Sequence, residues 1–534
     1  MPNETTPLPE EVAALQAMVR ALQEMLELER RKFENEKGRL EFELARALKL
    51  VYGPRADRLR TPQDVAQMLL GFAEELERRP AHPDDIAAGG DAAPPADELR
   101  RVQRATGRRN LARFEQLPVR RLVHELAPEA RACPGCGEPR AAIGEEVSWQ
   151  IEHVPAYFER IEHVRVKYAC PACEQAGEPP RIELAAKPAA AIEKGMAGPG
   201  LLAYIVTSKF SDYLPLYRLE DIFRRQGFEI ARATQSVWCG DVADLAEPLC
   251  ELMAERVRRS HVVGTDDTVM PMQEPGRGQV KKARLWVYLG DEAQPYNVFD
   301  FTESRGRDGP RQFLGDYAQV LVADAYGGYD GVVAGNAITR AGCWAHARRK
   351  FVDAEATAPG IAAEAVALVR QLYTVEREAT GLDPAARLAL RQARSLPVLA
   401  EMREQLARWQ PTLLPRHPMA EAVGYALNQW RELNAFAHDG AVPIDNNASE
   451  REIKRVVLNR KNSLFVGNPR GGRTAAILAS LASTCRRHAI DPQLYLTQLL
   501  VNLPAWPARD LEAWLPDQWK QRQAARLAEL AGPA

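Results

Sequence analysis

The sequence lacks the features that mark an exported or membrane-embedded protein. Its first residues, MPNETTPLPEEVAALQ, do not form a basic stretch followed by an apolar one, as a secretory signal requires. No apolar run approaches the ~20 residues that a transmembrane helix needs. We therefore expect the chain to work in the cytoplasm, without a membrane partner.

Charge of one sign is also lacking. The 534 residues carry a formal net charge of −2, so the chain as a whole is not attracted to polyanions. Hydrophobic residues make up 46% and charged residues 27%, which is typical of folded proteins with apolar cores. Positive charge gathers locally at 99–121 and 451–473, where it indicates either a solvated face or a phosphate-binding surface.

Cysteine is scarce, with eight residues in the whole chain. Four of them form two Cys-x-x-Cys pairs, Cys133 with Cys136 and Cys170 with Cys173. In a chain without an export signal, such pairs favour metal binding or redox chemistry over disulfides. Four thiolates suit tetrahedral Zn²⁺ and would leave no coordination position open, so we predict a structural zinc ribbon. Two unrelated pairs or a redox motif are the alternatives.

Periodicity divides the chain into segments, and its length predicts about three or four domains. A heptad pattern over residues 10–52 favours a coiled coil that joins two copies, or else a long helix packed on its own chain. Residues 198–256 have two amphipathic stretches separated at Gly227, compatible with a helix-turn-helix or with any pair of packed helices. From residue 261 short apolar runs predict strands, the first three at hairpin-like spacing.

Carboxylates follow two of the predicted strands. Asp266 and Asp267 come directly after HVVGT, and Asp324 comes after VLVA. A single aspartate in such a place is more often a turn or cap residue. Two strands that deliver aspartates at the same end, however, would bring charges together that repel one another and need a cation. Glu450, in DNNASE, is either a third member of this group or a helix-capping residue with Asn447 as the N-cap.

Taken together, Asp266, Asp324 and Glu450 resemble the DDE triad of transposases with a ribonuclease-H-like fold. Longer motifs are similar to one family, the insertion-sequence-66 transposases: DNNASEREIKRVVLNRKNSLFVG, DAYGGYD and CWAHARRKF. The resemblance extends over nearly the whole chain through PAYFERIEHVRVKYAC, KFSDYLPLYRLEDIFRRQG and DPQLYLTQLLVNLP. Two features depart from the family pattern. Asp267 stands where the family usually has Glu, and YGPRADRL replaces an FG-x-R-S-E pattern.

The resemblance implies a multidomain α+β chain with a ribonuclease-H-like α/β core that a helical segment interrupts. The predicted segments are an N-terminal coiled-coil helix at 1–79, a flexible linker with an Arg-rich stretch at 80–125, a zinc ribbon at 126–180, a helical helix-turn-helix-like region at 190–256, the core at 257–351 and 441–485, a helical insertion at 352–440, and a C-terminal helical segment at 486–534.

The resemblance also implies a chemistry. The three carboxylates would hold two Mg²⁺ or Mn²⁺ ions per active site, and the enzyme would cut at the ends of a mobile element and join the freed 3′-OH to target DNA. Cations near Glu450 would contact DNA: Arg451, Lys454, Arg455, Arg460, Lys461, Arg470 and Arg473. Supporting roles are expected for Asp267, His346, Arg349, Asn446 and Asn447. The expected partners are the element's terminal repeats, target DNA, a second copy of the chain and small accessory proteins.

Two alternatives have different activities. One is a DNA-binding regulator that has a zinc ribbon but an inactive catalytic domain. The other is a nuclease that hydrolyses DNA without joining strands. An intact set of three carboxylates argues against the regulator.

The zinc prediction is testable by metal analysis. Protein purified under reducing conditions should contain about one Zn²⁺ per chain, as a four-cysteine site requires. The double variant Cys170→Ser/Cys173→Ser should lose that ion because half of its ligands are gone. Cys485→Ser, which changes a cysteine outside both pairs, is the control. A carefully purified wild-type chain that contains no zinc would refute the ribbon.

Overall fold

A computed structural model describes residues 158–165, 167–169, 182–184, 189–193, 195–274, 276 and 278–531. The chain divides into two compact units, one of residues 61–186 and the other of 1–60 together with 187–534. The predicted coiled coil and linker, and the four zinc-ribbon cysteines, lie outside the described residues. In the smaller unit, β1 (Lys167–Ala169) pairs antiparallel with β2 (Ile182–Leu184), in the region where sequence alternation predicts strands.

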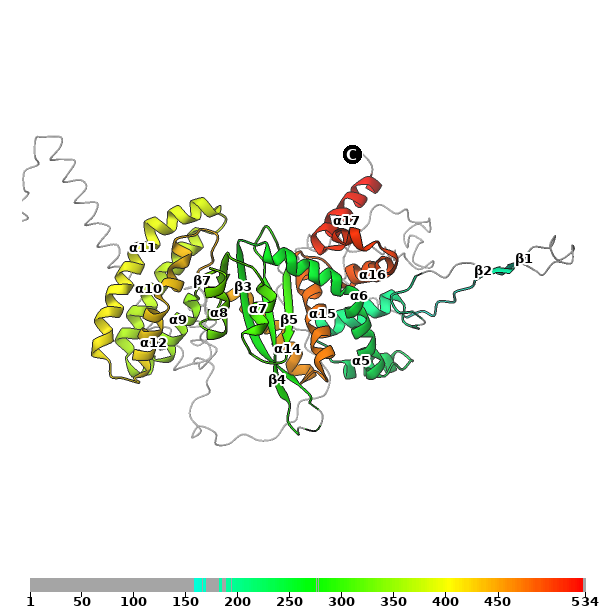
Figure 1. Ribbon diagram of the computed structural model, residues 1–534, viewed down its shortest axis with the longest axis horizontal. Helices are drawn as coiled ribbons and strands as arrows, with labels where there is room; N and C mark the ends of the chain where they lie inside the picture. The colour runs from blue at the N-terminus through cyan, green and yellow to red at the C-terminus, as the bar shows by residue number, and fades with distance from the viewer. Residues whose placement is uncertain are drawn as a thin grey trace, which may run out of the picture. The chain divides into compact units, whose positions relative to one another are not determined.

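The larger unit combines a sheet with many helices (Figure 1). Its strands are β3 (Val262–Met272), β4 (Lys281–Leu289), β5 (Asn297–Thr302), β6 (Val320–Val322) and β7 (Thr339–Ala341). The helices that precede the sheet are α4 (Pro199–Phe210), α5 (Leu216–Arg225) and α6 (Arg232–Arg258). Those that follow β5 are α7 (Asp308–Leu314), α8 (Asp330–Gly335), α9 (Trp344–Asp353), α10 (Pro359–Glu378), α11 (Pro384–Trp409), α12 (Pro418–Asn428), α13 (Trp430–Asn434), α14 (Asn447–Ser463), α15 (Pro469–Arg487), α16 (Pro492–Asn502) and α17 (Pro516–Ala531).

The sheet is mixed, with the strand order β5-β4-β3-β6-β7. β3, β4 and β5 form an antiparallel meander, whereas β3, β6 and β7 run parallel. The predicted hairpin spacing and the mixture of helices and strands are therefore confirmed. The boundaries of the predicted domains and the ribonuclease-H-like topology stay predictions.

Strand β4 shows how the sheet is held between two layers. Its side chains alternate between the faces, as the pleat of a strand requires. Leu285 and Val287 are fully buried in a cluster with Ile453 of α14. Tyr288 points the other way, where its ring stacks on that of Phe313 of α7 at a centroid distance of 3.6 Å. Helices therefore cover both faces of the central strands, and α14 lies directly against β3 and β4.

Helices α4 to α6 fill the region that sequence periodicity predicts to be helical. Helix α5 ends at Arg225, and Gly227, two residues later, turns the chain with a φ of +90° that only glycine adopts easily. The buried side of α6, which includes Trp238 and Leu249, belongs to the same core cluster as Leu478 of α15. Among the described helices, none is both long and apolar enough to cross a membrane.

Helices α10 to α13 form the helical segment between β7 and α14, as predicted. Their apolar core includes Leu372, Met402 and Phe436. A buried arginine ties this segment together. Arg391 of α11 forms a bidentate ion pair with Glu376 of α10 at 2.7–2.8 Å, and also donates to the carbonyl oxygens of Phe436, Asp439 and Val442. The chain that leads into α14 is therefore fixed by one side chain of the insertion.

Two arginines on α11 offer a matched test of this bond network. The variant Arg391→Met should lower the free energy of unfolding by about 3–5 kcal/mol, because it leaves the partly buried Glu376 and three carbonyl groups without their donor. Arg394→Met removes a surface pair with Glu378 and should lower it by less than about 1 kcal/mol. Denaturant unfolding followed by circular dichroism measures both. Equal effects of the two variants would contradict the structural role of Arg391.

Candidate active site

Two of the predicted carboxylates lie just beyond the point where the pairing of β3 with β6 ends. β3 and β6 run parallel, and their last pair is Gly264 with Val322. Asp266 and Asp324 each follow that pair by two residues. Because parallel strands keep a constant register, this brings both side chains to the same level and face. The sequence expectation that Asp266 stands at the end of its strand is wrong, because β3 continues to Met272 and Asp266 pairs with Val287 of β4 within it. Only Asp324 lies beyond the end of its strand.

Helix α14 brings the third carboxylate, Glu450, to the same part of β3. A side chain at Gly264 would have its Cβ only 2.8 Å from Ser449 Oγ, so glycine is what allows the helix to approach β3 closely. Asn446 Nδ2 donates to the carbonyl oxygen of Thr265 at 2.7 Å. These two contacts fix the beginning of α14 beside Asp266.

The three carboxylates influence one another electrostatically. The pKa of Asp266 is raised to about 7, chiefly by burial, with smaller contributions from the nearby carboxylates of Asp324, Asp267 and Glu450. The ionised form of Asp266 is therefore costly, because the group is buried beside other carboxylates. A divalent cation would remove that cost, and three carboxylates are ligands that Mg²⁺ and Mn²⁺ accept. The residues present thus fit a divalent metal site.

Asp267 is engaged by two arginines. Its Oδ2 accepts from Arg284 and its Oδ1 from Arg305, both at 2.9 Å, and only 3% of its side chain is exposed. The Arg305 guanidinium also lies 3.8 Å from the centre of the Tyr326 ring. Both oxygens of Asp267 therefore have cationic partners, whereas Asp266 Oδ1 accepts only from the amide of Asp267 at 2.8 Å among the described residues.

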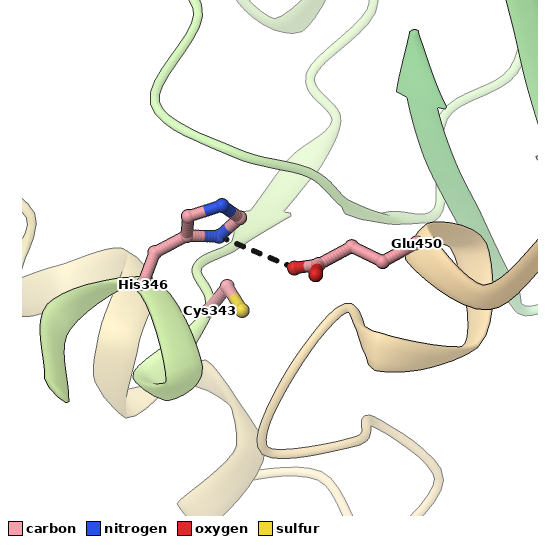
Figure 2. A group of neighbouring side chains, drawn as sticks. All are labelled: Cys343, His346 and Glu450. Carbon is pink, nitrogen blue, oxygen red and sulfur yellow. Dashed lines mark ion pairs between the residues drawn. The ribbon is translucent and has the colours of Figure 1, made fainter. Parts of the chain in front are cut away.

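A histidine and a cysteine lie beside Glu450. His346 Nδ1 is 3.7 Å from Glu450 Oε1, and this nitrogen is buried without a hydrogen bond to any described residue (Figure 2). Ligand atoms of Cys343, His346 and Glu450 all lie within 4.8 Å of one another. Burial raises the pKa of Cys343 to about 11, so its thiol is protonated at neutral pH. The thiol accepts a hydrogen bond from the amide of Asn446 at 3.3 Å. His346 is therefore placed to orient Glu450, and Cys343 to hold the start of α14.

The predicted capping arrangement is wrong. Helix α14 begins at Asn447, so the N-cap is Asn446, which turns its side chain to Thr265 of β3 and makes no capping bond. Asp445 takes over the cap, because its carboxylate accepts from the amide and the side chain of Asn447 at 3.0 and 2.6 Å. Glu450 is the fourth helical residue rather than the third. Its carboxylate is left to face His346.

The predicted DNA-contacting cations fall into two groups. Arg451, Lys454 and Lys461 are exposed on α14. The others have partners within the described residues: Arg455 pairs with Glu452, Arg460 donates to Thr268 and to the carbonyl of Val269, Arg470 pairs with Asp241 and Asp244, and Arg473 pairs with Glu247. Arg349 is exposed on α9. The exposed cations of α14 could contact a phosphate directly. The paired cations would have to give up, or share with the phosphate, the partners that they have among the described residues.

Sequence reasoning missed several neighbours of the site. Arg340 of β7 donates to the backbone carbonyl of Asp324 at 3.0 Å and pairs with Asp330. The amide of Tyr326 donates to Asp324 Oδ1 at 3.1 Å. Tyr373, from the helical insertion, donates to Asp445 at 2.7 Å. Of these neighbours and Cys343, only Cys343 could have been found from the sequence, because it stands three residues before His346 in the motif CWAHARRKF.

Comparisons with known proteins give a consistent picture. The profile described as "Transposase IS66 family" matches residues 194–474. The zinc-finger binding domain of transposase IS66 matches residues 130–174, and the IS66 C-terminal element matches residues 480–516. Two relatives from Sinorhizobium fredii (strain NBRC 101917 / NGR234) bear the names uncharacterized protein y4jD and y4qI. They are 34% and 33% identical to this chain, over 91% and 88% of its length and 95% and 86% of theirs.

The raised pKa of Asp266 predicts how stability depends on pH. Because the carboxyl has a higher pKa folded than unfolded, the folded state loses stability as pH rises from about 4 to about 7. Without added divalent ions, Asp266→Asn should therefore raise Tm at pH 8 and leave it unchanged near pH 4. Added Mg²⁺ should raise Tm of the wild type but not of the variant. Calorimetry at the two pH values measures this.

Asp267→Asn is the matched control for that experiment. It should lower Tm at pH 8, because it removes a charge that two arginines compensate. If both variants shifted Tm in the same direction, the assignment of different environments to the two adjacent aspartates would be wrong.

Proposed function

Because this chain belongs to the IS66 transposase family, we propose that it is a DNA transposase that cuts at the ends of a mobile element and joins them to target DNA. Family membership supports a transposase-type function, with a zinc-finger domain that suggests DNA and zinc binding. One observation carries the proposal of catalysis: Asp266 of β3 is buried at a place where the carboxylates of Asp324, two residues after β6, and of Glu450 on α14 act on it. Burial chiefly, and these charges to a smaller extent, raise its pKa to about 7. We assign catalysis to Asp266, Asp324 and Glu450.

The proposed active site belongs to a ribonuclease-H-like core. The sheet order β5-β4-β3-β6-β7, with an antiparallel meander followed by parallel strands, supports this topology. The helices α10 to α13 would be an insertion between β7 and the helix that carries Glu450. Self-association through a coiled coil at 10–52, and a need for small accessory proteins, are proposed from the sequence alone.

In the proposed reaction, Asp266, Asp324 and Glu450 would hold the divalent ions beside the substrate end. When bound, two Mg²⁺ or Mn²⁺ ions would activate the attacking oxygen and stabilise the leaving oxygen. Water attacks the phosphodiester at the element's end, the P–O bond to the 3′ oxygen breaks, and that oxygen leaves as a 3′-OH. The 3′-OH then attacks a phosphodiester of the target, and the target's own 3′ oxygen leaves with the proton.

The protein's side chains have distinct roles in this proposal. His346 orients the carboxylate of Glu450 from one side, and Asn446 fixes the helix that bears it from the other. Asp267 forms ion pairs with Arg284 and Arg305 and so has a structural role rather than that of a metal ligand. The exposed cations Arg451, Lys454 and Lys461 would meet DNA phosphates along α14.

The test is strand cleavage and joining with DNA that carries the element's terminal repeats. Asp324→Ala and Glu450→Ala should each lower both activities at least about 100-fold while DNA binding stays near normal, because carboxylate ligands act on the chemical step. Asp316→Ala and Glu404→Ala, which change exposed carboxylates elsewhere, are the controls. Asp324→Cys should be inactive with Mg²⁺ and partly active with Mn²⁺, since a thiolate suits softer ions better.

Other outcomes separate the alternatives. Binding without cleavage under any metal condition would favour a DNA-binding regulator. Cleavage without joined products would favour a nuclease. Near-normal activity of Glu450→Ala would remove Glu450 from the catalytic set.

A further inference from the structure

A cavity of about 780 Å³ lies along α14, where Glu452, Arg455 and Asn459 are among its lining residues and Glu450 is not. Its walls come from the ends of α4 and α6, from α15, and from the loop that joins α14 to α15. The floor is the sheet, at Met270, Leu285 and Phe299. Nothing in the proposed chemistry uses this cavity.

The cavity is strongly cationic. Six basic side chains line it: Lys209, Arg232, Arg455, Arg460, Arg470 and Arg486. Glu452 is the one carboxylate among the lining residues that the structure describes, and it is shared by Arg455 and Arg486 at 3.3 and 3.4 Å. The positive charge therefore exceeds the negative charge even after Arg470 is paired with Asp241 and Asp244. An anion would be attracted there.

Lys209 is a part-buried cation of this cavity with little compensation from the described residues. Its Nζ reaches Ser463 Oγ at 3.3 Å and has no carboxylate within ion-pair distance among the described residues. The surrounding chain desolvates it enough to lower its pKa. The nearby thiol of Cys239 is no counter-ion, because burial raises its pKa to about 12. A phosphate would compensate the charge of Lys209.

Apolar side chains stand exposed at the rim of the same cavity. Tyr217, Val237, Leu464 and Phe465 all line it and are between 41% and 65% exposed. The loop that carries Leu464 and Phe465 is fixed at the end of β3. The amide of Val466 donates to the carbonyl of Pro271, and the carbonyl of Val466 accepts from the amide of Gln273, both at 2.9 Å. Cations beside fixed aromatic and apolar surfaces are the combination by which proteins bind unpaired nucleotides.

From these observations we infer that the cavity binds an unpaired nucleotide of the DNA strand that the active site processes, with Lys209 and Arg232 at the phosphate and Phe465 against the base. This inference rests on the proposed function for the identity of the strand. Helix α14 connects the two places: Asn459, in the cavity wall, is nine residues beyond Glu450, which corresponds to about 14 Å along the helix axis. A strand leaving the carboxylates would reach the cavity within a few nucleotides.

The test measures binding of fluorescein-labelled oligothymidine to the full-length protein by anisotropy, over a series of salt concentrations and without added divalent ions. Lys209→Met should lower the slope of log affinity against log salt by about 0.7, the value for one lost phosphate contact on a single strand. Phe465→Ala should weaken binding about tenfold, as expected for one lost stacking contact, with the slope unchanged. Other DNA-binding segments contribute equally to every variant.

Matched controls and a second probe sharpen the result. Arg526→Gln and Leu527→Ala change an exposed cation and an exposed apolar side chain on α17 and should leave affinity and slope unchanged. If Lys209→Met does not fold, Arg232→Gln at the exposed rim replaces it. An oligonucleotide with abasic sites should bind the wild type more weakly than oligothymidine and should lose nothing further in Phe465→Ala.

The outcomes distinguish this inference from the proposed function. Asp324→Ala should bind oligothymidine like the wild type, so loss of catalysis leaves this measurement intact. Unchanged affinity and slope in the Lys209, Arg232 and Phe465 variants would overturn the inference even if the enzyme cuts and joins DNA. Equal competition by a poly-glutamate peptide would also overturn it, because the cavity would then recognise negative charge alone.

Discussion

The close packing of α14 on β3 is the constraint on which the candidate site depends. Gly264 leaves room for Ser449, and Asn446 donates to the backbone of Thr265. Without this contact, Glu450 would stand on a solvated helix, far from the strand that carries Asp266. The contact is also selective, because any side chain at Gly264 would collide with Ser449. Gly264, which has no side chain, therefore allows α14 to place Glu450 beside a strand that is distant in the sequence.

The helices α10 and α11 take part in this packing through side chains that reach the residues before α14. Tyr373 of α10 holds Asp445, and Asp445 caps α14 through Asn447. Arg391 of α11 holds the carbonyl groups of the chain that leads there. Cys343 and His346, at the start of α9, contact the other side of the same helix end. The sheet, α9 and α10 therefore all form hydrogen bonds with the residues at the start of α14. These bonds satisfy the polar groups of that turn and fix its position.

Much of this could be predicted from the sequence, and the reason lies in the range of the interactions. Strands β3 to β5 and helices α10 to α13 follow from local periodicity. The sequence placed both Asp266 and Asp324 at strand ends, whereas β3 continues past Asp266 to Met272 because it pairs with β4 over its whole length. The role of Asn446 could not be predicted. A local rule makes an asparagine in this place a cap, whereas in the structure its side chain is drawn to a strand far away in the sequence. The ion pairs of Asp267 could not be predicted for the same reason, since Arg284 lies on β4 and Arg305 in the loop after β5.

Helix α14 also explains why one segment of the sequence concentrates so many carboxylates, amides and cations. Its N-terminal turn faces the sheet. There Asn446 and Asn447 fix the start of the helix, and Glu450 is held near Asp266. Its C-terminal half borders the cationic cavity, where Arg455, Asn459 and Arg460 are lining residues. A rigid helix keeps these two functions at a fixed separation, about 1.5 Å for each residue between them. If a DNA strand spans both, the helix sets how many nucleotides separate the reacting phosphate from the bound base. A deletion inside α14 would alter that distance and rotate the two faces relative to each other, whereas exposed substitutions such as Leu458→Ala would change neither.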